Sequence, residues 1–420
     1  MKKILLFNIT LLVFILQSCT KEKCTELYDG ITYTPMYTPM SSLRTVNIQP
    51  AKVITSNGKI FIKGNYIFLN ELDKGFHIID NTNPTAPQRI AFVSIPGNID
   101  LIAKDNYLLV DNYVDLLTFD ISNPANIQLL KRTENALPFR NYGYGFTDNA
   151  TQGIIMGFEK KTEKMEIDCS KSNGWEKIDF GGVFMTAGST AIPPSTSLGG
   201  VNGQAGSFSR FAQINNYLYV SNGFSITPID VTNPIAPAVK QNVFSNEIET
   251  MYGFNNSILA GGPNGMYIYN LANPAVPTLQ STFNHWRGCD PVVAQNNTAY
   301  VTVRGGNETR CGGSRNILQA IDITNLSQPT LIKTYEMQHP YGLGLFNNKL
   351  GVCDGAAGIK LFNASNSNNL QLQHTINNVD AFDVIMNNET ALIVAKDGMY
   401  QYNISNINNP TLISKISITQ

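Results

Sequence analysis

Residues 75–87 read GFHIIDNTNPTAP, a short alternating apolar run that ends at Asp80 and leads into an Asn-Pro turn. The same pattern recurs along the chain. The further copies begin at Tyr113 (YVDLLTFDISNP), Phe224 (FSITPIDVTNPIAP), Gly265 (GMYIYNLANPAVP), Asn316 (NILQAIDITNLSQP), Gly358 (GIKLFNASNSNN) and Gly398 (GMYQYNISNINNP). Internal repeats are identified first, because the repeating unit decides the fold.

Each copy has an Asp or Asn at the same place, which we call the anchor. The anchors are Asp80, Asp120, Asp230, Asn270, Asp322, Asn363 and Asn403. Most neighbouring anchors are 40 or 41 residues apart, but Asp120 and Asp230 are 110 apart. A degenerate copy fits inside that gap, with Gly153–Glu159 (GIIMGFE) followed by Glu163–Asp168 (EKMEID). With Asp168 as a further anchor, the sequence predicts eight units.

The half of each unit before the anchor also repeats, as two short apolar runs around an Asn-Asn, Asp-Asn or Gly-Asn pair. Examples are AKDNYLLVD (103–111) and AQINNYLYVSN (212–222). Asn tolerates the left-handed backbone angles that tight hairpins need. The anchor carboxyl or amide is expected to accept a backbone N–H two residues further on and so to cap the following turn. Four-stranded units at this period predict an all-β fold, a single β-propeller of antiparallel blades, with eight blades favoured and seven as the alternative.

This pattern resembles the LVIVD-repeat family of bacterial and archaeal cell-surface propellers. The likeness is carried by LLVD (108–111), LLTFD (116–120) and FHIID (76–80), together with the Asn-Pro turns. It extends over residues 58–420. The resemblance implies the propeller fold and a surface location, and it implies no general activity for named residues.

The repeats divide residues 44–420 into a propeller with an irregular third unit. The expected blades are Lys59–Ile95, Asn98–Arg132, Asn141–Ala187, Phe208–Phe244, Glu249–Phe283, Asp290–Tyr335, Tyr341–Ile376 and Asp380–Ile418. Gly188–Ser207 is expected to be a long loop, which in a compact domain is either functional or mobile. Arg44–Thr55 is expected to be available as an extra strand along the last blade.

The N-terminus has the features of a bacterial lipoprotein signal peptide. Residues 1–18 begin with Lys2 and Lys3 and continue with a nearly continuous apolar run that is too short to span a membrane. Leu16-Gln17-Ser18-Cys19 resembles a lipoprotein processing site, so Cys19 is the predicted lipid attachment site; the alternative is ordinary secretion with Cys19 incidental. Residues 19–43 are interpreted as a lipidated tether. The protein is therefore expected to lie outside the cytoplasm, anchored to the outer membrane or cell surface.

Composition and charge argue against a nucleic-acid partner. Charged residues make up 15% of the chain and the formal net charge is −1. No basic stripe is present. The chain has 6 cysteines. Cys289 and Cys311 are predicted to form a disulfide, because the connections that carry them emerge on one face of a four-stranded meander; two free thiols are the alternative. The pairing of Cys24, Cys169 and Cys353 is left open.

Sequence motifs for metal binding, dinucleotide binding and nucleophilic catalysis are absent. The four histidines form no H-E-x-x-H pattern, and no C-x-x-C pair, G-x-S-x-G elbow or Gly-Lys-Ser/Thr loop occurs. We therefore expect no cofactor, no metal and no assigned catalytic residue. Whether the protein is an enzyme is left uncertain, and a non-catalytic role is favoured.

The variable connections are predicted to gather on one face of the propeller, where binding usually resides. The candidate binding residues there are His285, Trp286, Arg287, Arg304, His339, Tyr341, Asp354, Asp380 and Asp383. The leading interpretation is a surface lipoprotein with a binding or scaffold role toward a protein or glycan. The alternative is a propeller-fold hydrolase or lyase acting on a polysaccharide, with His285, His339 and Asp383 as an acid/base cluster.

Overall fold

The computed structural model describes residues 25–56, 58–143, 146–168, 183–185, 209–306, 312–387 and 389–418. The chain divides into two units. One consists of Met1–Thr38, Tyr142–Thr147 and Ile155–Thr196, and the other of Pro39–Asn141, Asp148–Ile154 and Ser197–Gln420. The larger unit is a seven-bladed β-propeller.

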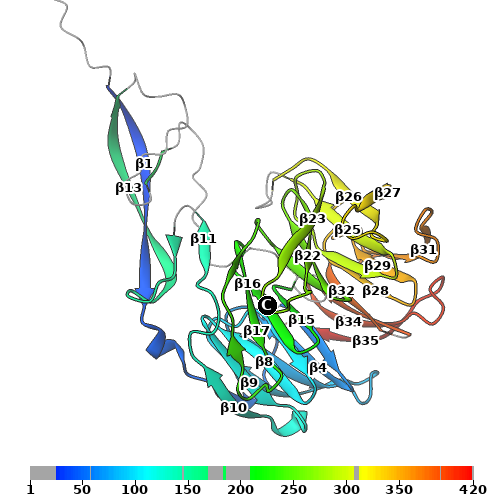
Figure 1. Ribbon diagram of the computed structural model, residues 1–420. Helices are drawn as coiled ribbons and strands as arrows, with labels where there is room; N and C mark the ends of the chain where they lie inside the picture. Colours follow the sequence, from blue (N-terminus) through cyan, green and yellow to red (C-terminus); the bar gives the residue numbers. More distant parts are fainter. Residues whose placement is uncertain are drawn as a thin grey trace, which may run out of the picture. The chain divides into compact units, whose positions relative to one another are not determined.

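Each blade of the larger unit is an antiparallel sheet whose strands follow one another in sequence order (Figure 1). The first two blades are β3 (Ile60–Lys63), β4 (Tyr66–Glu71), β5 (Gly75–Asp80) and β6 (Gln88–Ser94), and β7 (Leu101–Lys104), β8 (Tyr107–Asn112), β9 (Asp115–Asp120) and β10 (Gln128–Thr133). The third blade is β15 (Phe211–Ile214), β16 (Tyr217–Ser221) and β17 (Ser225–Asp230), with an outer strand split into β18 (Ala238–Val239) and β19 (Val243–Phe244).

The last four blades are the most regular. The fourth is β20 (Thr250–Phe254), β21 (Ser257–Gly262), β22 (Gly265–Asn270) and β23 (Thr278–Asn284), and the fifth is β24 (Val292–Gln295), β25 (Thr298–Arg304), β26 (Asn316–Asp322) and β27 (Thr330–Glu336). The sixth is β28 (Leu343–Phe346), β29 (Lys349–Cys353), β30 (Ile359–Asn363) and β31 (Gln371–Ile376), and the seventh is β32 (Ala381–Asn387), β33 (Thr390–Ala395), β34 (Gly398–Asn403) and β35 (Thr411–Ser417).

The hairpin between the first two strands of a blade forms as the sequence predicts. Asp105, Asn215, Asn255 and Asn296 adopt left-handed backbone angles with φ between 52° and 54°. Asn and Asp tolerate this region better than most other residues. The Asn-rich pairs therefore set the register of the inner hairpins.

The anchors cap their turns in all seven blades, which confirms the structural role predicted for them. The anchor side-chain oxygen accepts the backbone N–H two residues on, at 2.8 Å for Asp80 and Asp120, 3.0 Å for Asp230 and 2.7 Å for Asn270. The distances are 2.8 Å for Asp322 and 2.9 Å for Asn363 and Asn403. An Asn three residues later repeats the arrangement, for example Asn123 toward Ala125 at 3.2 Å. Here that Asn also opens the short helix η2 (Pro124–Asn126).

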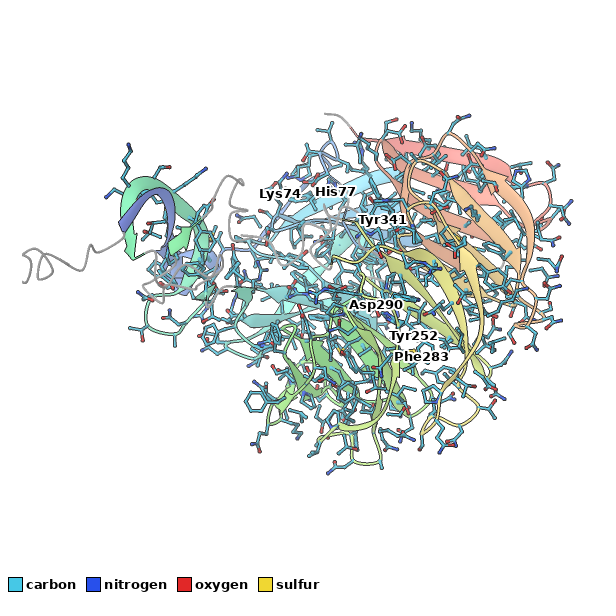
Figure 2. All side chains as sticks on the ribbon, turned by 90° about the horizontal axis from the view of Figure 1, so that it is seen from above. Lys74, His77, Tyr252, Phe283, Asp290 and Tyr341 are labelled. Carbon is cyan, nitrogen blue, oxygen red and sulfur yellow. The ribbon has the colours of Figure 1, made fainter. Side chains whose placement is uncertain are left out.

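The core lies between neighbouring blades, so no blade is stable alone. The side chains of β5 and β8, such as Phe76 and Leu108, share one buried cluster, and each later pair of blades shares another. Ile60 and Leu69 of the first blade pack with Leu392 and Val394 of the seventh, which closes the ring. Figures 1 and 2 show the red strands of the last blade beside the blue strands of the first.

The favoured count of eight blades is wrong, and the alternative of seven is correct. The segment around Asp168 does not make a four-stranded meander. Instead, β13 (Ile154–Asp168) is a single strand of 15 residues, and it pairs with β1 (Thr25–Thr38) in a separate sheet of order β13-β1-β14, where β14 is Val183–Met185. The predicted third blade, Asn141–Ala187, is therefore an insertion between the second and third blades, and Asp168 anchors no blade.

Two further expectations about the N-terminal region are also corrected. The expected tether contains β1, which pairs with β13 and β14 in the smaller unit. The extra strand is β2 (Asn47–Pro50), which pairs with β6 of the first blade through Asn47 and Ser94, and does not lie along the last blade. It follows the helix η1 (Met40–Leu43). Gly188–Ser207 lies outside the described residues.

The smaller unit has its own small core. Tyr142, Phe146 and Ile155 are buried together, with Tyr37 and Phe158 against them. They come from β1, β13 and the hairpin of β11 (Asn141–Gly143) and β12 (Phe146–Thr147). Among the described residues of the whole chain, no helix is long and apolar enough to cross a membrane.

Candidate functional site

One face of the propeller carries both the connections between blades and the connections between the second and third strands of each blade. We call it the loop face. The N–H of Asp73, in a connection of the second kind, donates to the carbonyl of Asn98, in one of the first kind, at 2.8 Å. Gly288 likewise donates to Pro263 at 3.1 Å. These hydrogen bonds confirm that the two kinds of connection share a face, as the meander geometry predicts.

The loop between the fourth and fifth blades presents Trp286 to solvent. Trp286 is 58% exposed, and the guanidinium of Arg315 lies 5.5 Å from its ring centroid. Arg315 also pairs with Glu336 at 2.7 Å. A Cβ placed on Gly313 would meet the carbonyl oxygen of Arg287 at 1.8 Å, so the loop between β25 and β26 lies directly against this one.

A buried ion pair holds this loop from beneath. The Nε2 atom of His285 lies 2.8 Å from Asp290 Oδ2, and its Nδ1 lies 2.7 Å from the carbonyl oxygen of Trp286. Both side chains are fully buried. Gly262 donates its N–H to the same Asp290 oxygen at 3.1 Å. Asp290 is therefore paired with His285.

Burial and the hydrogen bond compete in setting the protonation of this pair. Burial raises the pKa of the Asp290 carboxyl to about 7, and the hydrogen bond from His285 only partly opposes this. Burial alone would lower the pKa of His285, but the interaction with Asp290 outweighs it and the pKa is raised. The Asp290 carboxyl and the His285 imidazole therefore keep their protons to a higher pH in the folded protein than they would in the unfolded chain.

Next to this loop, an arginine stacks on a tyrosine across two blades. The Cζ atom of Arg304, at the end of β25, lies 4.0 Å from the ring centroid of Tyr341 in the connection to the sixth blade. Tyr341 also contacts His339 and Phe382, with ring centroids 5.3 Å and 5.2 Å away. Arg304 is buried, and its Nε has no hydrogen-bond partner among the described residues. Asp290 and Tyr341 are both labelled in Figure 2.

Asp354 fixes the backbone that carries His339 and Tyr341. Its carboxylate accepts the N–H groups of Gln338 at 3.0 Å and His339 at 2.6 Å, and it pairs with Lys360. The Tyr341 N–H donates to the carbonyl of Cys353 at 2.7 Å. Asp354 is fully buried, so its role is to position the loop rather than to meet a ligand directly.

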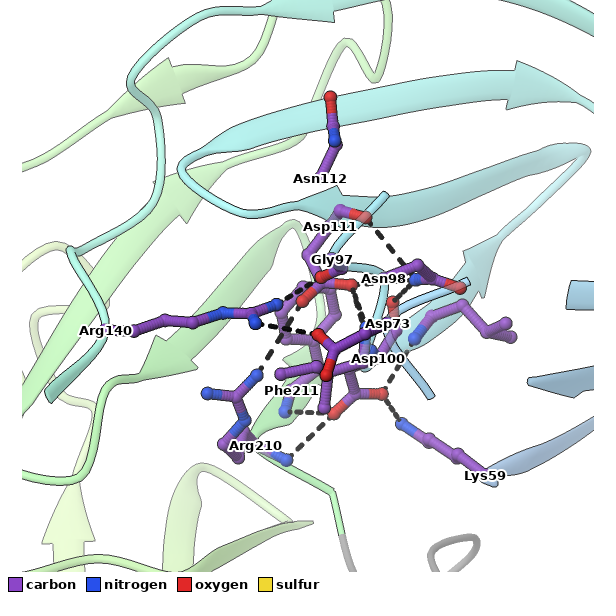
Figure 3. A network of polar contacts seen from close by, with 12 residues as sticks. Lys59, Asp73, Gly97, Asn98, Asp100, Asp111, Asn112, Arg140, Arg210 and Phe211 are labelled. Atoms are coloured by element: carbon purple, nitrogen blue, oxygen red, sulfur yellow. Dashed lines mark hydrogen bonds and ion pairs between the residues drawn. The ribbon is translucent and has the colours of Figure 1, made fainter. Parts of the chain in front are cut away.

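A second polar network joins the first three blades on the same face (Figure 3). Asp100 pairs with Lys59 and accepts from the Ser209 hydroxyl at 2.9 Å, and Lys59 lies 2.6 Å from that hydroxyl. Lys59 lies at the entry to the first blade, Asp100 at the entry to the second and Ser209 at the entry to the third, so this contact joins three blades. Buried ion pairs are weak stabilisers, but removing one partner leaves a costly unpaired charge.

Arginines surround the same network. Arg140 pairs with Asp73 at 2.8 Å, and Arg210 lies 3.7 Å from Asp111. Burial raises the pKa of Asp111, and the two arginines oppose that rise. Sequence analysis missed Lys59, Asp73, Arg140 and Ser209, because no local pattern signals a contact between blades.

The remaining candidate residues are placed as follows. Asp383 is fully buried, and its carboxylate accepts the N–H of Val384 at 2.8 Å. Asp380 is half-buried and Arg287 is exposed. Of the histidines proposed for the acid/base cluster, His285 pairs with Asp290 and His339 lies against the ring of Tyr341. The described part of the chain also contains no group of His, Cys, Asp and Glu side chains able to hold a metal ion.

The cysteines are only partly within the described residues. Cys289 is buried, while Cys311, Cys24, Cys169 and the predicted lipid attachment site Cys19 lie outside them. The Cys289–Cys311 disulfide and lipidation of Cys19 therefore stay predictions. Cys353 is a buried free thiol.

Comparison with known proteins identifies the repeat and the fold. The LVIVD repeat matches residues 56–94, 93–134, 205–244 and 312–337, which fall in the first, second, third and fifth blades. No curated protein matches the chain.

Several solved structures share the architecture. A computationally designed protein, Ika8, is 10% identical with a TM-score of 0.52, covering 88% of this chain and 91% of its own. Sqt1 of Saccharomyces cerevisiae is 7% identical with a TM-score of 0.51, covering 91% and 89%. A chain of the Mitotic Checkpoint Complex is 10% identical with a TM-score of 0.52, covering 86% and 90%. At these identities the likeness shows the fold alone.

Proposed function

We propose that this chain, a β-propeller that carries the LVIVD repeat in four places, is a non-catalytic binding or scaffold protein that meets a protein or glycan partner with its loop face. The observation that carries the proposal is the exposed Trp286 on a loop held by the buried His285–Asp290 pair. An exposed aromatic side chain on a rigid loop favours binding, because little conformational entropy is lost when a partner contacts it.

The neighbouring cation defines the chemistry of the contact. The guanidinium of Arg315 lies over the exposed Trp286 ring, while the buried Arg304 supports the face from below through its stack on Tyr341. Guanidinium groups beside aromatic rings suit carboxylate-bearing or hydroxyl-rich partners, since they donate several hydrogen bonds in a fixed geometry. The catalytic alternative lacks comparable support, because both ring nitrogens of His285 are occupied, one by Asp290 and the other by the carbonyl of Trp286.

We also infer that the mature protein is held at the outer membrane or cell surface by a lipid on Cys19. The support is the sequence alone: a basic start, an apolar run and a small residue before the cysteine. A lipid anchor would place the propeller outside the cytoplasm without a membrane-spanning helix. Metabolic labelling with a palmitate analogue should mark the wild type and leave Cys19→Ser unlabelled. Equal labelling of both, or no label on the wild type, contradicts the anchor.

The binding role is tested by affinity capture from an envelope extract and by a glycan array, with three forms of the mature protein. Wild type and Leu412→Ala should recover the same partner, and Trp286→Ala should lose it. Leu412 is a suitable control because it is 53% exposed on β35, the outer strand of the last blade. Equal recovery by all three forms would refute a role for the loop face.

A further inference from the structure

The opposite face of the propeller, formed by the hairpin turns and the Asn-Pro turns, holds a pocket between the fifth and sixth blades. Its volume is about 200 Å³. The hairpin of the fifth blade lines one side with Gln295, Asn297 and Thr298, and the turn after β30 lines the other with Ser365 and Ser367. Asn348 crosses between the blades, because its N–H donates to the Gln295 side chain at 3.2 Å.

The pocket arises from two departures from the repeat in the sixth blade. The residue after the anchor is Ile, Val or Leu in five other blades, and Asn81 in the first; in the sixth it is Ala364. In the fourth blade the equivalent Leu271 packs in one cluster with Tyr219, as Ala364 does with Tyr300. Ala364 therefore leaves unfilled the space that a larger side chain takes elsewhere.

The second departure is at the position after the second Asn of the turn. It is apolar in the other six blades (Pro84, Pro124, Pro234, Pro274, Leu326 and Ile407) and polar in the sixth. In the fourth blade, Pro274 follows the second Asn of the turn, and its carbonyl accepts the Tyr219 hydroxyl at 3.0 Å. In the sixth blade the same position is Ser367. The hydroxyl of Tyr300, the counterpart of Tyr219, has no hydrogen-bond partner among the described residues, and Tyr300 lines the pocket. The Tyr219 hydroxyl has an acceptor in the neighbouring blade, whereas the equivalent Tyr300 hydroxyl remains available to a ligand in the pocket.

The lining is polar but uncharged. It combines side-chain amides and hydroxyls with the apolar surface of Leu345 and Ala364. Burial raises the pKa of Tyr300 to about 12, so its hydroxyl stays neutral and able to donate at physiological pH. No Lys, Arg, Asp, Glu or His lines the pocket to balance an ionic ligand. Amide and hydroxyl groups around an apolar patch match the alternating hydroxyl and C–H surface of a neutral sugar.

We propose that this pocket binds one neutral monosaccharide unit, free or at the end of a glycan. The volume is that of about seven liquid-water molecules, which suits a single pyranose ring and excludes a larger rigid ligand. The site is independent of the loop face, since no residue of the pocket belongs to that face.

The test is titration of the mature protein with methyl β-glucoside, methyl β-galactoside, methyl α-mannoside and N-acetylglucosamine, followed by saturation-transfer NMR. A ligand of this size is expected to bind with a Kd of about 1 mM, the affinity typical of a small polar ligand in a single pocket. Glucuronate and inorganic phosphate serve as charged probes and are expected not to bind.

Two variants test the pocket, and each introduces a residue that another blade has at the same position, as Leu271 and Phe68 show. Ala364→Leu fills the space, and Tyr300→Phe removes the free hydroxyl. We expect Ala364→Leu to weaken binding by about tenfold or more, and Tyr300→Phe to weaken it by about threefold to tenfold. Tyr300→Phe keeps the test decisive if Ala364→Leu fails to fold.

Matched controls come from the other blades. Tyr219→Phe removes the hydroxyl that already has a partner, and Ser405→Ala alters the seventh-blade equivalent of Ser365. Both should bind sugar as the wild type does. The proposal is overturned if none of the four sugars binds the wild type at about 50 mM, or if Ala364→Leu and Tyr300→Phe both bind as well as the wild type.

Discussion

The guanidinium carbon of Arg304 lies 4.0 Å from the ring centroid of Tyr341, which joins the end of a strand in the fifth blade to the entry of the sixth. The stack occurs on the loop face beside Trp286 and Asp290. Because Arg304 is buried, its side chain is part of the rigid support of that face and is not a free surface cation.

Replacing Arg304 by Ala should lower the free energy of unfolding by about 2 kcal/mol, through the lost stacking on Tyr341 and the lost packing of the aliphatic stem. Urea denaturation measures this directly. Arg315→Ala is the matched control, because the Arg315 side chain is 39% exposed and its loss should cost about 0.5 kcal/mol or less. Equal stability of the two variants would mean that the Arg304 stack does not support the face.

Asp290→Asn should change how stability depends on pH. The ordinary pKa of Asp290 is 3.8 and its folded pKa is about 7, so the folded state keeps a proton that the unfolded state releases. The contribution of Asp290 to stability is therefore fully present below pH 3.8 and is lost as the pH rises toward 7. The raised pKa of His285 acts in the same direction.

The free energy of unfolding should accordingly fall less steeply between pH 4 and pH 7 in Asp290→Asn than in the wild type. Denaturant titrations at several pH values in this window give both slopes. Glu336→Gln, at an exposed position, should keep the wild-type slope. If Asp290→Asn has the wild-type slope as well, the carboxyl does not titrate as this account requires.

Asp230→Ala should destabilise the protein by about 1 kcal/mol, because the N–H of Thr232 loses its acceptor. Asp230→Asn should be close to neutral, since the chain itself uses Asn at the same place in Asn270, Asn363 and Asn403. Thermal unfolding of the two variants separates the cap from the charge. An equal loss in both would show that charge, and not capping, is what the anchor supplies.

Cys289 and Cys311 are predicted to be joined in the mature protein. Non-reducing peptide mapping by mass spectrometry should recover one cross-linked peptide, which disappears in Cys289→Ser. Cys353 should resist alkylation until the protein unfolds, because burial raises the pKa of its thiol and covers it. Recovery of Cys289 as a free thiol from oxidising conditions would contradict the bridge.

The sequence predicts most of the propeller but not how many blades it has. Asp80 and its counterparts cap their turns as expected, because an Asx turn is a local structure and its signal is local. The prediction that segment 153–168 forms part of an eighth blade is wrong. An alternating apolar strand has the same sequence pattern whether it pairs within a blade or with a distant strand. Its pairing with β1, more than a hundred residues earlier, leaves no trace in the period.

The sequence predicts which residues lie on the loop face, but it does not predict the buried contacts that hold those loops in place. The shared face followed from meander geometry, which places His339 and Arg304 near Tyr341. Burial of Asp354 and Asp383 depends on packing between blades, which no local pattern carries. The pocket between the fifth and sixth blades is marked in the sequence only by the small Ala364 and the polar Ser367, and its lining by Tyr300 depends on contact between blades.

The most direct test of the binding role is the equilibrium affinity of the captured partner for wild type, Trp286→Ala and Leu412→Ala, measured by isothermal titration calorimetry. We predict that Trp286→Ala weakens binding by about thirtyfold, as expected for a central aromatic contact worth about 2 kcal/mol, while Leu412→Ala binds like the wild type. Wild-type affinity in Trp286→Ala would contradict the assignment of the loop face as the recognition surface.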